Sequence, residues 1–420
     1  MGWLRESSSI RILFFIYVSF TSSIFLNVTA SADCKVHAFY YLWYGTPEHN
    51  NGVYLHWNHE VLPHWKTVEN IKLKSIIGKR YVPPEEIHSP FYPQRGLYSS
   101  SDPKLLDAHM AELKRAGICM AVLSWWGQAS RNNTHDTQGV KTDNVIQHVV
   151  EAAERNDIKI SFHLEPYHGR TANSVLEDTD YLMERFGESR ALHRSSDNRP
   201  VFYVYDSYHV SSEDWKNAFS SIRKTEKDKV FIALWLNRDG GQMAFDGGFD
   251  GVYTYFASNG FSYGSTSSNW AHMRRFAKEH NLLFVPSVGP GYDDSFIRPW
   301  NIRNRKKRKD GEYYKLMWED AIASVPDAVS ITSFNEWGEG TQIEPAISKT
   351  IEKEHIHVDN PYAMKRSVEA FRVYEDYGSH GPNFYIDMTR QYSKKLVHKI
   401  KKEKQKVPLL ERQKNTKVEL

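Results

Sequence analysis

The sequence predicts an α/β fold, a (β/α)8 barrel of the TIM type that forms a single domain with a long loop after the first strand. The chain has 420 residues, a length that such a barrel can occupy as one unit. Eight apolar segments alternate with helical patterns along it, which is the count for eight strands each followed by a helix. The segments are almost continuously apolar, as expected for parallel strands buried on both faces.

The predicted elements follow one another at the spacing of a repeated strand and helix. The strands are 36–45, 117–126, 159–167, 200–206, 230–237, 251–258, 282–292 and 328–340, and the helical patterns between them include 103–116, 144–156, 211–224, 270–280 and 313–324. Ser101-Asp102-Pro103 indicates a helix start, because Asp caps a first turn and Pro fits its first position. Residues 46–101, rich in Pro, His and Trp, form the long loop, and loops of that length are usually functional.

The N-terminus carries a targeting pattern. Arg5 and Arg11 flank its start, an apolar stretch follows, and the small residues at 30–32 match a signal-peptidase site. Residues 1–32 are therefore interpreted as a signal peptide, and the alternative is an uncleaved signal anchor. Only the anchor would attach the protein to a membrane. In both cases the barrel domain, residues 33–393, enters the lumen of the secretory pathway.

The net charge of +3 is unevenly distributed. Residues 394–420 hold ten Lys or Arg against three Glu, so this basic tail carries +7 and the rest of the chain carries −4. The body of the protein is thus not a nucleic-acid binder by its charge. The tail is expected to be a solvated helix or a disordered arm. The basic run 303–309 is interpreted as an exposed loop, with a processing site or an anionic contact as alternatives.

Two cysteines and one sequon bear on the compartment. Cys34 and Cys119 precede predicted neighbouring strands, so a disulfide and two buried free thiols are both compatible with the sequence. Asn132 heads a glycosylation sequon in a polar loop, which suits a lumenal protein.

Polar and aromatic side chains gather at the carboxyl ends of the predicted strands. Active sites of barrels lie at this end. Aromatic rings stack on the apolar faces of sugars, while carboxylates and amides bind sugar hydroxyls. The pattern therefore predicts a carbohydrate site. The residues singled out for contact with the sugar are Tyr44, Trp125, Trp126, Glu165, Tyr167, Tyr255, Tyr292, Arg298, Asn335 and Trp337.

The strongest pattern is Asn335-Glu336-Trp337-Gly338-Glu339, which follows the last predicted strand. Two carboxyl groups three residues apart on a turn can face one cavity, and glycoside hydrolysis needs such a pair. Mutual repulsion, together with the flanking Trp337, would raise the pKa of one carboxyl and keep it protonated near neutral pH. Glu336 and Glu339 are therefore the candidate catalytic residues.

Nothing in the sequence favours a metal or another cofactor. His56, His59 and His64 lie near one another, but no H-E-x-x-H pattern is present. The Gly- and Asp-rich stretch 238–251 lacks the spacing of a calcium loop. A serine nucleophile elbow is also missing from the sequence. We therefore expect no metal site and no cofactor.

Eight segments resemble the endo-α-1,2-mannosidases of glycoside hydrolase family 99. In order they are FYYLWYG, YLHWNHEVLPHW, VLSWW, FHLEPY, FYVYDSY, DGVYTYFASNGFSYGS, PSVGPGYDDSFIRPWN and ITSFNEWGEGTQIE, from about residue 38 to residue 345. The resemblance implies a (β/α)8 barrel and metal-independent cleavage within N-glycan branches of glycoproteins, with retention of configuration and release of a glucosylated mannose unit. It also implies a Golgi location; the endoplasmic reticulum and secretion are the alternatives.

The same resemblance assigns roles to individual residues. Glu336 would deprotonate the 2-hydroxyl of the sugar being cleaved, and Glu339 would act as general acid and then as general base. The positions for substrate contact that it carries over are Tyr44, His56, Glu165, Tyr255 and Arg298. One departure is Trp126, which stands where Tyr is expected in vertebrate members and Trp in bacterial ones. A mannan-directed endo-mannosidase and a catalytically silent glycan-binding barrel are the alternative functions.

Overall fold

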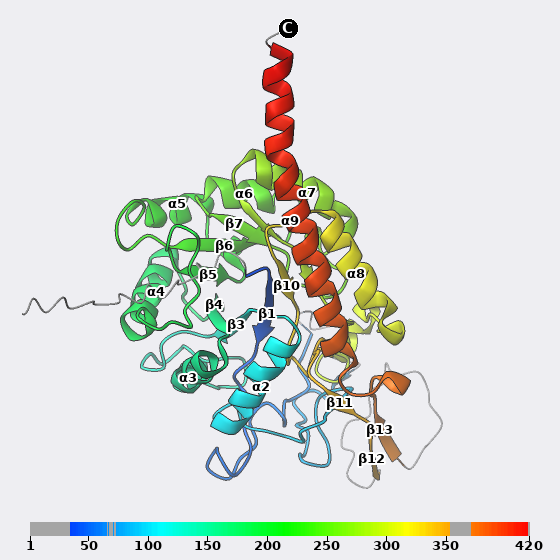
Figure 1. The fold of residues 1–420 in the computed structure, drawn as a ribbon. Helices are drawn as coiled ribbons and strands as arrows, with labels where there is room; N and C mark the ends of the chain where they lie inside the picture. Colours follow the sequence, from blue (N-terminus) through cyan, green and yellow to red (C-terminus); the bar gives the residue numbers. More distant parts are fainter. Residues whose placement is uncertain (1–33, 65, 67–69, 71–72, 353–370, 419–420) are drawn as a thin grey trace, which may run out of the picture. The chain divides into compact units, whose positions relative to one another are not determined.

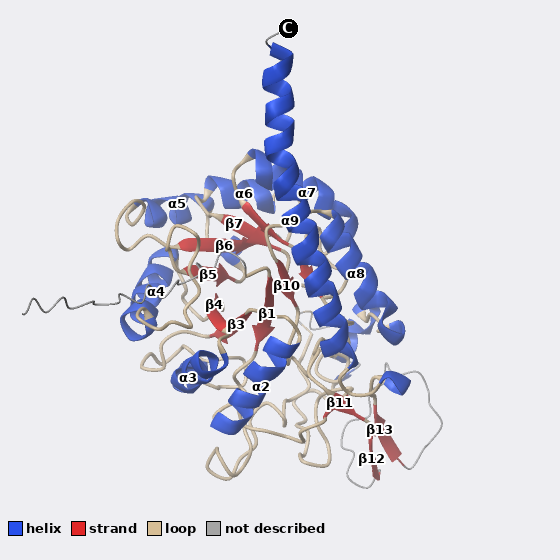
Figure 2. Ribbon diagram, in the orientation of Figure 1, coloured by secondary structure: helices blue, strands red, loops and turns tan. Residues whose placement is uncertain are grey.

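The computed structural model describes residues 34–64, 66, 70, 73–352 and 371–418. The predicted leader, residues 1–32, therefore lies outside the described residues. Figure 1 shows the course of the chain from β1 in blue to α9 in red, and Figure 2 shows helices surrounding the central strands. Among the described residues, no helix has the length and apolar character needed to cross a membrane.

A ring of parallel strands forms the centre of the fold. The strands of the main sheet are β1 (Val36–Tyr40), β3 (Met120–Trp125), β4 (Lys159–Leu164), β5 (Val201–Val204), β6 (Val230–Leu234), β7 (Gly251–Tyr253), β8 (Leu283–Val285), β9 (Ser287–Val288) and β10 (Val329–Ile331). Their order is β8-β7-β6-β5-β4-β3-β1-β10-β9. Each predicted strand segment contains one of these strands, and 282–292 contains both β8 and β9.

The strands β8 and β9 are two halves of one barrel strand. Phe284 in β8 pairs with Val252 in β7, and Val288 in β9 pairs with Ile331 in β10. Pro286 lies between the halves and has no backbone N–H to donate, so the ladder is interrupted there. The sheet nevertheless closes through Leu283–Val288, which gives eight barrel strands. The predicted (β/α)8 barrel is therefore confirmed.

Helices follow the strands as the barrel pattern requires. They are α2 (Pro103–Arg115), α3 (Ile146–Asn156), α4 (Ala172–Phe186), α5 (Ser212–Ser220), α6 (Gly240–Asp246), α7 (Trp270–Glu279), α8 (Glu312–Ala323) and α9 (Phe384–Val418). Short 3-10 helices include η5 (Pro299–Asn304) and η6 (Lys309–Gly311). Two small antiparallel pairs join β2 (Tyr92–Pro93) to β11 (Ala346–Ile347) and β12 (Lys349–Glu352) to β13 (Phe371–Tyr374). The helix α2 begins at Pro103, and the Asp102 side chain caps it by accepting from the Lys104 amide.

The predicted boundary at residue 394 falls inside α9. Leu396 and Ile400 are buried with the main hydrophobic core, and the Ser393 hydroxyl donates to the Gly117 carbonyl at 2.8 Å. Tyr392 stacks on Trp318 of α8. The first half of α9 is therefore part of the packed helical layer around the barrel.

A disulfide joins Cys34 to Cys119, ahead of β1 and β3. The two strands pair with each other, so their preceding residues lie close, with 5.5 Å between the two Cα atoms. The sequence left a disulfide and free thiols open, and the structure has the disulfide.

The interior of the barrel is aromatic and polar. The ring of Phe39 contacts those of His163, Tyr203 and Tyr253 there, with 4.7 Å between the ring centroids of Phe39 and His163. The imidazole of His163 is hydrogen-bonded to the Tyr253 hydroxyl at 2.7 Å. Buried polar groups of this kind are costly unless paired, so these pairs stabilise the floor on which the strand-end residues rest.

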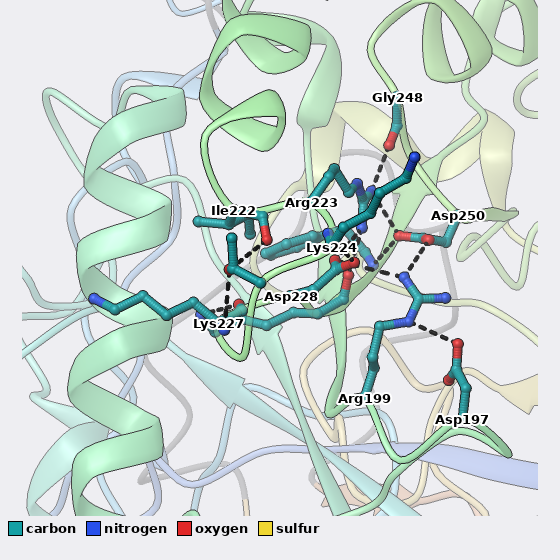
Figure 3. Close-up of polar contacts among 12 residues, drawn as sticks. Asp197, Arg199, Ile222, Arg223, Lys224, Lys227, Asp228, Gly248 and Asp250 are labelled. Atoms are coloured by element: carbon teal, nitrogen blue, oxygen red, sulfur yellow. Dashed lines mark hydrogen bonds and ion pairs between the residues drawn. The ribbon is translucent and has the colours of Figure 1, made fainter.

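The amino-terminal ends of β5, β6 and β7 are joined by an ion-pair network (Figure 3). Arg199 contacts Asp197 and Asp250, while Arg223 contacts Asp228 and Asp250, with distances of 2.7–2.9 Å for these contacts. Ion pairs at this end of a barrel serve stability rather than chemistry, because active sites of barrels lie at the opposite end of the strands.

Candidate active site

The two candidate catalytic glutamates lie on the turn that follows β10. The turn is closed by a hydrogen bond between the Ser333 and Thr341 hydroxyls at 2.8 Å, and the Ser333 hydroxyl also accepts from the Glu336 amide at 2.8 Å. The Glu339 amide donates to Glu336 Oε2 at 2.6 Å. This contact holds the Glu336 carboxyl group against the backbone of its partner, so the turn keeps the two acidic residues together.

Buried side chains support this turn from behind. The Asn335 amide group bonds both backbone groups of Tyr41, accepting at 2.8 Å and donating at 3.0 Å. The Tyr44 hydroxyl donates to the Asn335 carbonyl and accepts from the Trp337 amide. The Trp337 indole donates to the Tyr98 hydroxyl and to Glu344.

Asn335, Trp337 and Tyr44 were predicted to contact the sugar, and that contact stays a prediction. All three are buried, and their polar side-chain atoms are bonded to the protein. Within residues 335–339, side chains that hold the turn alternate with side chains that face the site. The sequence alone therefore could not distinguish residues that contact a sugar from residues that hold the turn. In this structure the three residues fix the backbone of the turn that carries Glu336 and Glu339.

A cation lies beside the carboxyl pair. Arg298 precedes η5, and its guanidinium contacts Glu339 Oε1 at 3.1 Å and Asp294 Oδ2 at 3.2 Å. The Tyr292 hydroxyl donates to the same Asp294 oxygen at 2.8 Å. Tyr292 and Arg298 were both predicted for the site. Arg298 contacts Glu339 directly, and Tyr292 is linked to Arg298 through the carboxylate of Asp294.

A third carboxylate comes from the end of β4. Glu165 Oε1 accepts from the Ser124 hydroxyl and is bonded to His163, both at 2.8 Å. Tyr255 stacks on the His163 ring, and its hydroxyl is hydrogen-bonded to that of Tyr41. Glu165 and Tyr255 are thus brought together at the barrel mouth, on the polar floor described above.

The long loop 46–101 brings His56 to the same mouth. His56 has a positive φ of 59° and its Nε2 is paired with Asp136. Trp43 stacks on the imidazole with ring centroids 4.2 Å apart. Burial acts to raise the pKa of Asp136, but His56 and the amides of the Asp136 loop lower it overall. The aspartate is therefore a carboxylate that fixes the orientation of His56.

The two tryptophans at the end of β3 point in different directions. Trp125 lies between the barrel and its helices, where its indole donates to Asp143 at 2.9 Å, and its contact with the sugar stays a prediction. Side chains alternate along a strand, and Ser124 takes the inward position. Trp126 instead lines a cavity of about 430 Å³, and its indole N–H has no hydrogen-bond partner among the described residues.

That cavity also contains Tyr167 from the end of β4. Its lining residues are Trp126, Asn133, His135, Asp136, Thr137, Pro166, Tyr167 and His168. The Tyr167 hydroxyl donates to Ser174 and Asp178, so its ring edge rather than its hydroxyl is left for a ligand. Since Asp136 both lines the cavity and holds His56, the cavity adjoins the His56 side of the site.

Burial dominates the electrostatics of the carboxyl pair. It raises the pKa of Glu336 well above the ordinary value, and the charge of Glu339 adds to the effect. Burial also raises the pKa of Glu339, while Arg298 partly offsets the rise. Glu336 is 5% exposed, whereas the Glu339 side chain is 20% exposed, so the pair opens to solvent through Glu339. Paired carboxyls of this kind titrate as a unit and can share one proton near neutral pH.

The described residues include no group of three or more His, Cys, Asp or Glu arranged to hold a metal ion. His59 and His88 lie near His56, but burial lowers the pKa of both, to about 3 for His88. They are neutral rings packed against one another.

Sequence reasoning missed several members of the site. Asp136, Asp294, Tyr41 and His163 each orient a predicted residue, yet they lie in other segments of the chain. The only signal in the sequence was adjacency, since Tyr41, His163 and Asp294 each lie two to four positions from a residue that was chosen. Asp136 had no such signal, because it meets His56 across 80 positions.

Comparison with known proteins identifies the family. The profile described as "Glycosyl hydrolase family 99" matches residues 31–398. The chain belongs to glycoside hydrolase family 99. It is therefore a glycoside hydrolase, and the resemblance noted in the sequence is confirmed.

Relatives of this family 99 chain are similar over most of its length. It is 39% identical over 370 residues to glycoprotein endo-alpha-1,2-mannosidase of Mus musculus, which covers 86% of this chain and 74% of the relative. It is 40% identical to a glycoprotein endo-alpha-1,2-mannosidase-like protein of Danio rerio, over 85% of this chain and 77% of that one. The solved family 99 endo-alpha-mannosidase of Bacteroides thetaiotaomicron matches with a TM-score of 0.75 and 32% identity, over 87% of this chain and 98% of the other.

Proposed function

We propose that the chain is a retaining endo-α-1,2-mannosidase that cleaves inside N-glycan branches of glycoproteins and releases a glucosylated mannose unit. The observation that carries the proposal is the turn that holds Glu336 and Glu339 together beside Arg298. The names of the relatives point to the same bond. Family 99 membership over residues 31–398 places these residues within the matched region.

The reaction uses one carboxyl group as base and one as acid. Glu336 takes the proton of the 2-hydroxyl, and the freed oxygen attacks the anomeric carbon of the same sugar. The bond to the leaving oxygen breaks as Glu339 delivers its proton to that oxygen. Glu339 then takes a proton from water, the water oxygen attacks the anomeric carbon, and Glu336 returns its proton to the 2-oxygen as the three-membered ring opens. Two inversions at one carbon give retention.

The raised pKa values fit this exchange. A buried pair that shares one proton has a base and an acid available at the same pH. Burial and the charge of Glu339 raise the pKa of Glu336, and the bond from the Glu339 amide acts against this rise by favouring the carboxylate, which is the form a base needs. We assign sugar contacts to Arg298, Glu165, Tyr255 and His56, and stacking on the outermost sugar to Trp126.

We place the protein in the lumen of the secretory pathway, with the Golgi as the preferred compartment. The Cys34–Cys119 disulfide supports this, since disulfides persist in oxidising compartments. Fractionation of tagged full-length protein against Golgi and endoplasmic-reticulum markers tests the location. A cytosolic pool with reduced cysteines would contradict it.

Activity is tested on a glucosylated high-mannose glycan. The parent protein is expected to release a disaccharide with the α configuration at its new reducing end, observed by proton NMR before mutarotation. Glu336→Gln and Glu339→Gln are each expected to lose about 10²–10⁴-fold in kcat. The matched control is Glu279→Gln, at the exposed end of α7. Full activity in either active-site variant, or a β product, would reject the proposed roles.

A mannan-directed activity is the second candidate, and Trp126 is the observation that favours it. The residue lines the 430 Å³ cavity. Comparing kcat/KM on glucose-capped and mannose-capped substrates, in the parent and in Trp126→Tyr, separates the candidates. The proposal expects a preference for glucose in the parent. A preference for mannose that Trp126→Tyr reverses would support the second candidate.

A further inference from the structure

The basic run 303–309 is only partly the exposed loop that its composition suggests. Arg303, Lys307 and Lys309 are exposed, whereas Arg305 and Arg308 are partly buried. Lys306 forms two backbone hydrogen bonds with Tyr292, at 2.8 and 3.0 Å, which fix the run beside the end of β9. Two arginines are thereby directed at the residues that surround the catalytic turn.

Arg308 binds the catalytic turn through its backbone. One guanidinium nitrogen, Nη2, donates to the Gly340 carbonyl at 2.9 Å and to the Gln342 carbonyl at 2.7 Å. Gly340 directly follows Glu339, and its φ of 60° is a left-handed conformation that glycine adopts readily. The two carbonyls therefore fix the chain on the carboxyl side of Glu339.

An aromatic cage holds the same guanidinium in place. Its central carbon lies 4.5 Å from the ring centroid of Phe91, 4.6 Å from that of Tyr385 and 5.0 Å from that of Tyr377. Nε and Nη1 are buried and have no hydrogen-bond partner among the described residues, so the rings are their surroundings. Cation–π contacts of this kind are favourable, and they suit the planar arginine head better than lysine.

Arg305 acts on the other side of the turn. Its Nε contacts Asp293 Oδ2 at 2.7 Å, and the Asp293 amide donates to the Glu339 carbonyl at 2.7 Å. The backbone of Glu339 is thus held from Asp293 on one side and from Arg308 on the other. The backbone that carries the Glu339 side chain is therefore fixed independently of the contact between Glu339 and Arg298.

We infer that Arg308 is a positioning residue for Glu339. By fixing the carbonyls of Gly340 and Gln342, it keeps the Glu339 carboxyl group within reach of Arg298 and beside Glu336. The inference rests on the proposed function, because it gives Arg308 a part in the same acid–base pair. It also changes the interpretation of the basic run, whose partly buried arginines serve the site while its exposed lysines remain at the surface.

The test compares Arg308→Met and Arg308→Lys with two controls in the full chain. Lys307→Met removes a neighbouring exposed charge, and Arg223→Met weakens the ion-pair network at the opposite end of the barrel. We expect Arg308→Met to lose roughly 100-fold in kcat with KM changed less than twofold, since a small misplacement of a catalytic group has that effect. Arg308→Lys is expected to lose about tenfold, because a lysine can reach one carbonyl but cannot fill the cage.

The pH profile separates positioning from a loss of stability. Arg298 lowers the pKa of both carboxyl groups, so a Glu339 that drifts away from it titrates at higher pH. Both Arg308 variants are therefore expected to shift the pH optimum upward. Arg223→Met is expected to lower Tm while its pH optimum and kcat stay those of the parent. Unchanged kcat and pH optimum in folded Arg308→Met, or in folded Arg308→Lys where the methionine variant does not fold, would overturn the inference.

Hydrogen exchange gives a readout that needs no turnover. The amides of residues 336–344 are expected to exchange faster in the Arg308 variants than in the parent, while the barrel strands keep their protection. A parent that releases no disaccharide would reject the proposed function and leave this measurement intact. Equal exchange of this segment in parent and variant would overturn the inference about Arg308 even if the parent is active.

Discussion

The carboxyl pair should cost the folded protein stability, and replacing Glu336 by Gln should recover it. Glu336 is nearly buried, and both its burial and the charge of Glu339 raise its pKa. The Gln variant keeps an oxygen to accept from the Glu339 amide, so it removes the charge and retains the shape. We expect Glu336→Gln to be inactive and more stable than the parent at pH 8.

The pH dependence of this stability gain follows from the linkage between proton binding and folding. A carboxyl group whose pKa is higher in the folded than in the unfolded state binds its proton more tightly when folded, so its ionisation opposes folding as pH rises. The gain from Glu336→Gln should therefore be absent below the unfolded pKa of about 4.3 and increase toward the folded pKa. Removing one poorly compensated buried charge should give about 1–3 kcal/mol at pH 8. For a chain of this size that is about 1–4 °C in Tm.

Thermal unfolding from pH 4 to pH 8 measures this gain. The expected result is a difference in Tm between Glu336→Gln and the parent that increases with pH. Glu279→Gln is the matched control, since an exposed carboxylate should give a small difference without a trend. If Glu336→Gln is as stable as the parent at every pH, or more stable than the parent only at pH 4, the assignment of a raised pKa to Glu336 is refuted.

Three further outcomes follow from contacts at the site and the disulfide. Arg298→Met should move the pH optimum of turnover upward, because the cation lowers the pKa of both carboxyl groups; an unchanged or lower optimum would contradict this. Gly338→Ala should cost about 1–3 kcal/mol and about tenfold in kcat, since the new Cβ would lie 2.7 Å from a ring carbon of the buried His88; a variant with parental Tm and kcat would show that the turn can yield. Cys34→Ala with Cys119→Ala should cost about 3–5 kcal/mol in denaturant unfolding, because the disulfide spans 85 residues; a loss below 1 kcal/mol would contradict it.

The barrel could be predicted because its strands are buried on both faces. Near-continuous apolar runs and the helical patterns between them were sufficient to locate every barrel strand. The same property hid the direction of each side chain, since a strand with two buried faces shows no alternation. Along β3, for example, the inward position belongs to Ser124 and Trp125 faces the helices, which the apolar run alone does not show.

Residues that hold the site in place from distant segments of the chain were harder to predict than the site residues themselves. Arg308 contacts the turn that carries Glu336 and Glu339 from 32 and 34 positions away, and Asp136 contacts His56 from 80 positions away; nothing local marks either residue. The basic run looked like solvated charge because composition cannot show that two of its arginines point inward. The fold had to bring these segments together before their chemistry could be recognised.

The two ends of the barrel divide stability from chemistry. At the amino-terminal ends of β5–β7, Arg199 and Arg223 share the carboxylates of Asp228 and Asp250 in contacts that bring each charge next to its opposite. At the other end Arg298 contacts the carboxylates of Glu339 and Asp294, and Glu336 lies against the Glu339 amide. Burial and the neighbouring negative charges raise the pKa values of Glu336 and Glu339. A barrel suits this arrangement, because strands fixed at one end can hold unfavourable charges together at the other. The excess of negative charge makes a shared proton available, and acid–base cleavage of a glycoside needs that proton.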